Sequence, residues 1–101
     1  MNVQEFIKQY GWGKSSVIVF ESIGYGANTF YDTCDELYYG QINDIRVSVA
    51  ELKQYIDAWD LVESLDGLSS AKITLQRGEF GDFEMLKQAI ELVESVNENQ
   101  D

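Results

Sequence analysis

The chain has 101 residues, of which 45% are hydrophobic and 13% aromatic, and it contains no proline. This composition is typical of a globular protein, since a disordered chain would carry fewer apolar residues. Eighteen acidic residues against seven basic ones give a formal net charge of −11. Such a charge would repel nucleic acid and anionic lipid, and it would attract a basic protein surface.

A single cysteine and the absence of histidine limit the chemistry that the chain can perform. Cys34 has no second cysteine for an internal disulfide, and zinc sites of the Cys₄ or Cys₂His₂ type are excluded. Residues 1–10 lack the apolar run of a signal peptide, and the apolar run 17–20 is too short to cross a bilayer. We therefore expect a cytoplasmic protein that does not bind membranes.

The first 22 residues predict one helix and one ambiguous segment. Asn2 can cap a short helix that has Phe6 and Ile7 on its apolar side and ends at Gly11. The segment 11–22 contains four consecutive apolar residues, three of them β-branched, which favours a strand. A second helix that starts near Lys14 and runs through residue 21 fits the same residues, and periodicity does not separate the two over so short a span.

Residues 23–49 predict a loop followed by a small antiparallel sheet. Gly24 and Gly26 supply backbone freedom to the loop. The runs 29–33, 35–39 and 44–49 are rich in aromatic and β-branched residues, and their short connections require antiparallel neighbours. Alternation in the last run predicts one face made by Ile45, Val47 and Val49.

Helical signals dominate the rest of the chain. Ser48 and Glu51 form a capping box, and Gly67 ends the helix that follows it. The apolar stripe of that helix consists of Val49, Leu52, Tyr55, Ile56, Trp59, Val62 and Leu65. Residues 68–78 predict a short helix capped by Ser69 or Ser70.

The last predicted helix is capped by Asp82. Its apolar stripe consists of Phe83, Leu86, Ile90 and Val93, with Met85, Ala89 and Val96 beside it. The sequence therefore predicts a single α+β domain over residues 1–96, in which about three short antiparallel strands pack against three to four helices. Residues 97–101 are predicted to be a polar disordered tail.

Motifs for catalysis are weak. Without histidine, nucleophiles of the Ser–His and Cys–His type are excluded. Cys34 lies between Asp32 and Asp35, whose negative charges oppose formation of the thiolate. The acids at 32–36 lack the alternating pattern of a calcium loop, and the Gly-Lys-Ser at 13–15 lacks the upstream glycine of a phosphate-binding loop. We expect no enzymatic activity, no cofactor and no dedicated metal site.

Acidic and tyrosine side chains form the predicted contact surface. Adjacent residues of a strand alternate, so Tyr31 and Tyr38 share one face while Phe30 and Tyr39 share the other, and either pair can face the core. Exposed tyrosine beside carboxylate is typical of protein-binding surfaces. The predicted partner-binding residues are Tyr31, Asp32, Asp35, Glu36, Tyr38, Asp44, Asp57, Asp60 and Glu63.

Three segments, 5–15, 26–32 and 47–72, resemble small acidic accessory proteins encoded by tailed phages and prophages. The resemblance implies that residues 13–21 are helical. It also implies action inside a bacterial host cell, since phage proteins of this class include inhibitors of restriction and CRISPR enzymes. No catalytic residue follows from it.

These observations lead to two hypotheses. In the first, the chain is a non-enzymatic phage protein that binds a basic host protein, in the sharpest form as a DNA mimic of the anti-CRISPR or antirestriction type. Carboxylates three or four residues apart on a helix are roughly 5–6 Å apart at Cβ, comparable to the spacing of phosphates. In the second, the chain is a structural or regulatory module that forms homodimers, and its acidity serves solubility.

Overall fold

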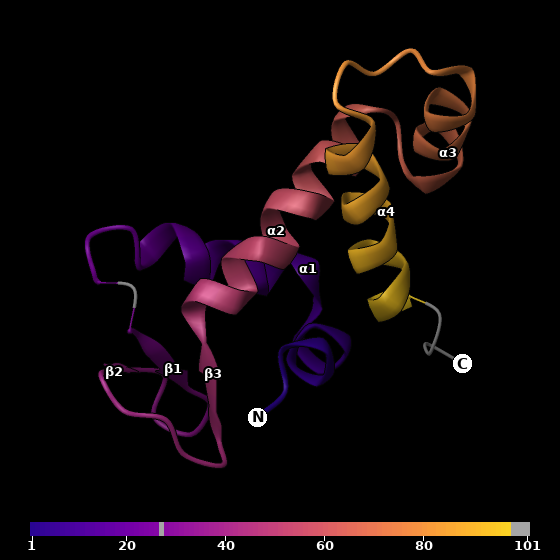
Figure 1. Cartoon of the computed structure of the whole chain (residues 1–101). Helices are drawn as coiled ribbons and strands as arrows, with labels where there is room; N and C mark the ends of the chain where they lie inside the picture. The colour runs from indigo at the N-terminus through magenta and orange to yellow at the C-terminus, as the bar shows by residue number, and fades with distance from the viewer. Residues whose placement is uncertain (27, 98–101) are drawn as a thin grey trace. The chain divides into compact units, whose positions relative to one another are not determined.

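A computed structural model describes residues 1–26 and 28–97 (Figure 1). Four helices and a three-stranded antiparallel sheet confirm the α+β fold class. The chain divides into two compact units, Met1–Ile56 and Asp57–Asp101. The predicted tail begins with Asn97, the last residue of a helix, and its remaining residues lie outside the described ranges.

Helix α1, Val3–Glu21, begins at the predicted cap. The Asn2 side-chain oxygen accepts hydrogen bonds from the backbone amides of Gln4 and Glu5, at 2.7 and 3.3 Å. Gly11 adopts a φ of 91°, which kinks the helix where the first helical segment was expected to end.

Residues 13–21 are helical, so the strand favoured by their β-branched side chains is wrong. Ser15, Ile18 and Ser22 are buried, whereas Val17 and Phe20 are exposed. This spacing of three and four residues is that of a helix packed on one side. Tertiary packing outweighs the weak β-propensity of these residues.

The sheet of the first unit consists of β1 (Phe30–Asp32), β2 (Tyr38–Tyr39) and β3 (Arg46–Ser48) in the order β2-β1-β3. Both neighbours of β1 are antiparallel to it. Val47 is fully buried at the centre of β3. The predicted common strand face is wrong, because Ile45 lies outside the strand and is exposed while Val49 begins the next helix.

Helix α2, Val49–Ser64, starts at the predicted capping box, where the Glu51 amide donates to the Ser48 hydroxyl at 3.3 Å. Leu52 and Ile56 of this helix are buried. Gly67, with a φ of 96°, donates its amide to the Val62 carbonyl at 3.0 Å and ends the helix as predicted.

Helices α3, Leu68–Arg77, and α4, Phe83–Asn97, pack together in the second unit. The N-cap of α3 is Gly67 and no side chain caps it, so the predicted caps Ser69 and Ser70 are wrong. The predicted cap of α4 is confirmed, since Asp82 accepts from the Met85 amide at 3.0 Å.

The buried stripe of α4 consists of Leu86, Ala89, Ile90, Val93 and Val96. Phe83 and Met85 are more than half exposed, at 51% and 54%, so their predicted place in this stripe is wrong. Both lie in the first turn of the helix, ahead of the residue at which the buried stripe begins. Within the ranges that the structure describes, no helix has the length and apolarity needed to span a membrane.

Ser48 caps α2, whereas Ser69, a predicted cap, does not cap α3, so replacing each of these serines tests the assigned helix caps. Replacing Ser48 with alanine removes the hydroxyl that accepts from Glu51, so we expect the free energy of unfolding to fall by about 1 kcal/mol. Replacing the exposed Ser69 should change it by less than about 0.5 kcal/mol. Urea denaturation followed by circular dichroism measures both values, and equal losses would contradict the assigned caps.

Candidate functional site

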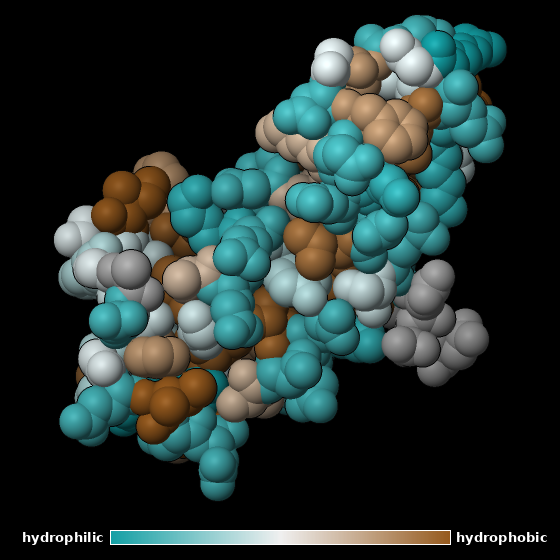
Figure 2. Space-filling view, in the orientation of Figure 1, coloured by the Kyte–Doolittle hydropathy of each residue, from teal (hydrophilic) through white to brown (hydrophobic). Residues whose placement is uncertain are grey.

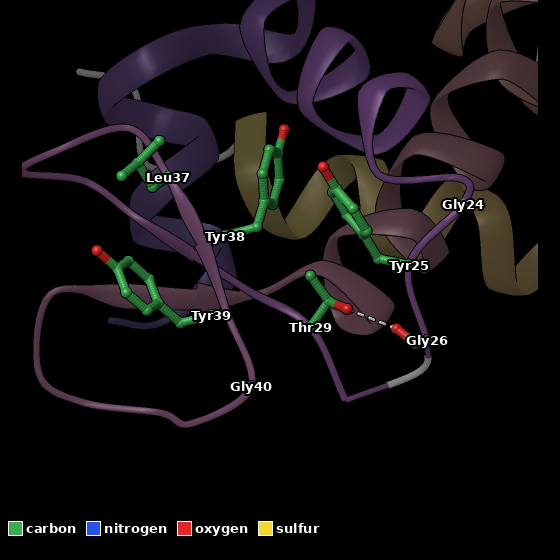
Figure 3. Close-up of a pocket in the computed structure, with 8 residues that line it drawn as sticks. All are labelled: Gly24, Tyr25, Gly26, Thr29, Leu37, Tyr38, Tyr39 and Gly40. Atoms are coloured by element: carbon green, nitrogen blue, oxygen red, sulfur yellow. Dashed lines mark hydrogen bonds between the residues drawn. The ribbon is translucent and has the colours of Figure 1, made fainter.

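A groove of about 680 Å³ lies on the first unit, between the loop that follows α1 and strand β2 (Figure 3). We call it the tyrosine groove, and its lining residues are Gly24, Tyr25, Gly26, Thr29, Leu37, Tyr38, Tyr39 and Gly40. Tyr25 and Leu37 are 56% and 57% exposed, a large fraction for side chains of this size. Exposed aromatic and apolar side chains on the walls of one groove make it a candidate binding surface.

Two tyrosine rings stand side by side in the groove, Tyr25 and Tyr38, with their hydroxyls directed the same way (Figure 3). Their centroids are 5.2 Å apart and the planes are inclined by 47°. The single proton of the Tyr38 hydroxyl is shared between two acceptors, the Ile18 carbonyl at 3.3 Å and the Glu21 carboxylate at 3.5 Å. A negative charge therefore lies at the hydroxyl end of this pair.

Burial, and then the negative charge of Glu21, raise the pKa of Tyr38 to about 12. The phenol is therefore neutral at physiological pH and keeps the proton that it donates. Tyr38 belongs to β2, and its hydroxyl contacts α1 at the Ile18 carbonyl. Its ring is therefore held in place and packs against one side of the more exposed Tyr25 ring.

The inner face of the sheet includes Tyr31, which the sequence analysis expected on the contact surface. Tyr31 is only 5% exposed, and its ring packs edge-on against Phe6 and Tyr38 with centroids 6.0 and 5.5 Å away. The expectation that Tyr31 lies exposed on a contact surface is therefore wrong. Tyr31 and Tyr38 are cross-strand partners on the core side of the sheet, which is one of the two arrangements that the sequence left open.

The outer face of the sheet is held by an ion pair, which we call the Asp32–Arg46 clamp. The Arg46 Nε donates to Asp32 Oδ2 at 2.9 Å, and Asp32 Oδ1 accepts from the amides of Cys34 and Asp35 at 2.9 and 3.2 Å. Arg46 also donates to the Gln41 carbonyl at 2.8 Å. One buried carboxylate and one guanidinium thereby connect the two turns that flank β2.

This engagement removes Asp32 from the predicted contact surface, where its placement is wrong. The side chain is buried, and its hydrogen bond to Arg46 is the main reason that the pKa of Asp32 lies below its ordinary value of 3.8. The acids of residues 32–36 serve internal contacts. Besides Asp32, Asp35 accepts from the Tyr39 hydroxyl, and Glu36 pairs with Lys14 at 3.4 Å.

Tyr39 lies on the other side of β2 from Tyr38 (Figure 3). The Arg46 guanidinium lies over its ring, 3.7 Å from the centroid, in a cation–π contact. The hydrogen bond to Asp35 is the first cause that raises the pKa of Tyr39 above its ordinary value, and desolvation adds to it. The clamp therefore fixes the strand whose backbone and side chains form one wall of the groove.

Of the other predicted contact residues, Tyr38 is half-buried and lines the tyrosine groove, and the six acids are exposed. Asp35, Glu36 and Asp44 are exposed in the first unit. Asp57, Asp60 and Glu63 are exposed on the part of α2 that belongs to the second unit. The predicted residues thus divide between two units and do not form a single site within either of them.

Negative charge is concentrated in the second unit. Residues 57–101 contain eleven acids and three bases, whereas residues 1–56 contain seven acids and four bases. The formal charge is therefore −8 for the second unit and −3 for the first, which together make the −11 of the chain. Among the described acids of the second unit, Glu94 pairs with Lys72 at 3.3 Å and Glu79 with Arg77 at 3.7 Å.

Sequence reasoning missed the residues that line the groove most openly, Tyr25 and Leu37, and the apolar side chains beside them. Phe20 and Ile23 are 74% and 71% exposed, and Figure 2 shows apolar side chains gathered around the loop that follows α1. A second hollow of about 290 Å³ shares Tyr25 and Gly26 with the groove. The sequence did contain one signal, a tyrosine between two glycines in a predicted loop. A large aromatic side chain in such a loop has no evident role in a core, and loop residues often bind other molecules.

Within residues 1–26 and 28–97, no group of three or more Asp, Glu, Cys or His side chains is arranged to hold a metal ion. Cys34 is an exposed free thiol in the turn between β1 and β2.

The lowered pKa of Asp32 gives the clamp a defined pH dependence. A carboxyl whose pKa is depressed in the folded state stabilises the fold above its ordinary value of 3.8, and this stability is lost as the pH falls through the folded-state value. We expect Arg46→Gln to lower the free energy of unfolding clearly at pH 7 and by a smaller amount at pH 3. Urea denaturation at the two pH values measures the difference.

The exposed ion pair of Arg77 and Glu79 offers the matched control. Arg77→Gln should change the free energy of unfolding by less than about 0.5 kcal/mol at pH 7, because water screens a pair of this kind. If Arg46→Gln is equally harmful at both pH values, or no more harmful than Arg77→Gln, the clamp does not stabilise the sheet in the way described.

Comparisons with known proteins give this arrangement no relative: no protein-family model matches the chain, and neither curated proteins nor solved structures give a significant match. The resemblance to small phage proteins therefore stays a prediction.

Proposed function

We propose that this chain is a non-enzymatic protein that acts by binding a protein partner with a basic surface, and that the tyrosine groove makes the central contact. The observation that carries the proposal is the exposure of Tyr25 and Leu37 in a groove with the Glu21 carboxylate at one end. Tyrosine gives a large contact area at low entropic cost, and carboxylates at its hydroxyl end favour a cationic partner.

The second unit supplies long-range attraction in this proposal. With eleven acids against three bases, it produces a negative potential that acts over about a Debye length, roughly 8–10 Å in physiological salt. Charge of this kind raises the rate of encounter with a basic partner more than it strengthens the final complex. In this proposal the acidic unit increases the rate of association with the partner, and the groove makes the contacts that stabilise the complex.

The sharpest form of the proposal is an inhibitor, encoded by a phage or prophage, of a nucleic-acid-binding host factor, such as an anti-CRISPR or antirestriction protein. Its support is the net charge of −11 and the exposed carboxylates Asp57, Asp60 and Glu63, which recur every three residues along α2. Such a row resembles the charge of a nucleic-acid backbone and would attract the basic groove of the host enzyme.

Self-association is the second candidate, and the exposed apolar side chains of Phe20 and Ile23 favour it. An apolar interface between two copies would be insensitive to salt, whereas a complex with a basic partner weakens as salt is added. Sedimentation at low and high salt separates the candidates: a dimer that persists unchanged supports self-association and contradicts the proposal of a basic partner.

The proposal is tested by capturing host proteins on the immobilised chain, eluting with a salt gradient, and measuring the kinetics of binding to the purified partner. Reversing Asp57, Asp60 and Glu63 to lysine should slow association by roughly tenfold at low salt and leave dissociation nearly unchanged. Tyr25→Ala should instead speed dissociation, because it removes contact area from the complex.

Circular dichroism of each variant serves as the control for folding. The difference in association rate should largely disappear at about 1 M salt, where the Debye length is roughly 3 Å. A partner whose affinity does not change with salt, or a charge-reversed variant that associates as fast as the wild type, would exclude the proposed mode of binding.

A further inference from the structure

Three glycines line the tyrosine groove, and the chain's own backbone does not require them. Gly11, Gly67 and Gly78 have positive φ angles that favour glycine, whereas Gly24, Gly26 and Gly40 do not. A Cβ atom at any of the three groove glycines would meet nothing within 4 Å. Gly13 and Gly81, outside the groove, share both properties, so the groove is distinguished by having three such positions together in its walls.

A stretch of backbone without side chains allows another molecule to approach it closely. Gly24 and Gly26 come from the loop, and Gly40 follows β2 directly, so each wall of the groove contains backbone without a side chain. Strand β2 lies at the edge of the sheet, because the strand order is β2-β1-β3. A bare groove beside an edge strand fits an extended main chain better than a bulky compact ligand.

The charged and aromatic groups of the groove define the side chain that this segment carries. The exposed ring of Tyr25 stands beside Tyr38, and the Glu21 carboxylate lies at the hydroxyl of that neighbour. A planar guanidinium can stack on the ring and pair with the carboxylate at the same time, whereas the ammonium of lysine is a point charge. The chain already uses this contact internally, where Arg46 stacks on Tyr39.

We propose that the tyrosine groove binds an extended, arginine-bearing segment of the partner protein. The main chain of the segment lies along Gly24, Gly26 and Gly40, and its guanidinium stacks on Tyr25 and pairs with Glu21. This inference rests on the proposed function and adds the chemistry of the recognised segment.

A blocked peptide with the sequence acetyl-Gly-Val-Arg-Val-Gly-amide is the probe, and the same peptide with citrulline in place of arginine is its neutral match. Isothermal titration calorimetry with the full chain measures both affinities. We expect the arginine peptide to bind roughly three- to tenfold more tightly than the citrulline peptide, and Glu21→Gln to remove most of that difference. Glu5→Gln, an exposed acid at the other end of α1, should leave it unchanged.

Filling the groove gives the second arm of the test. Gly40→Val places a side chain in the open space of the groove and should weaken binding of the arginine peptide roughly tenfold or more. Gly81→Val is the matched control, since Gly81 also has open space around it and lies outside the groove. Thermal unfolding checks that both proteins fold, and Gly24→Val replaces Gly40→Val if the latter does not.

Equal binding of the two peptides, or unchanged binding after the groove is filled, would overturn the inference. This failure is distinguishable from failure of the proposed function. If the purified partner binds the Gly40→Val protein with wild-type affinity and strong salt dependence, binding to a basic partner stands and the groove is not its contact.

Discussion

The hydrogen bonds of the Asp32–Arg46 clamp are the interaction on which the arrangement of the first unit depends. A buried ion pair stabilises a fold only when the remaining lone pairs and protons also find partners. Here the carboxylate accepts from Arg46 and from two backbone amides, and the guanidinium donates to the Gln41 carbonyl as well. The two turns around β2 are therefore tied to one point, and a strand of only two residues is held firmly enough to form a wall of the groove.

Most of the net charge and the tyrosine groove lie in different units of the chain. The first unit has a net charge of only −3, from seven acids and four bases, and it contains the groove. The second unit has most of the net charge, and its core is built from α3, α4 and the end of α2. Long-range attraction and short-range recognition follow different physical rules, the first depending on net charge and salt and the second on fitted surfaces. A protein that binds a basic partner benefits from both, and neither requires a catalytic residue.

Local signals in the sequence predicted the fold class and most helix boundaries, because a cap acts within three residues of its helix. Asn2, Ser48 and Asp82 all accept the amide hydrogen bonds expected of them. The secondary structure of residues 13–21 was ambiguous in the sequence. These residues are helical because one side of the segment, with Ser15 and Ile18, is buried by tertiary packing, which local propensity does not predict. The candidate site was less predictable because it also depends on tertiary contacts. The partner of Asp32, Arg46, is fourteen residues away in the sequence. Alternation along a strand shows which residues share a face, but it does not show which face is buried.

The central claim is that the tyrosine groove is the surface that meets a partner, and chemical-shift mapping tests it most directly. Amide ¹H–¹⁵N spectra of the full chain, recorded as the arginine peptide is added, locate the contact residue by residue. The account predicts that the largest changes cluster at Gly24, Tyr25, Tyr38 and Gly40, with Glu21 beside them. Changes that follow the exposed carboxylates of α2 and α4 instead, and leave the groove unaffected, would contradict it.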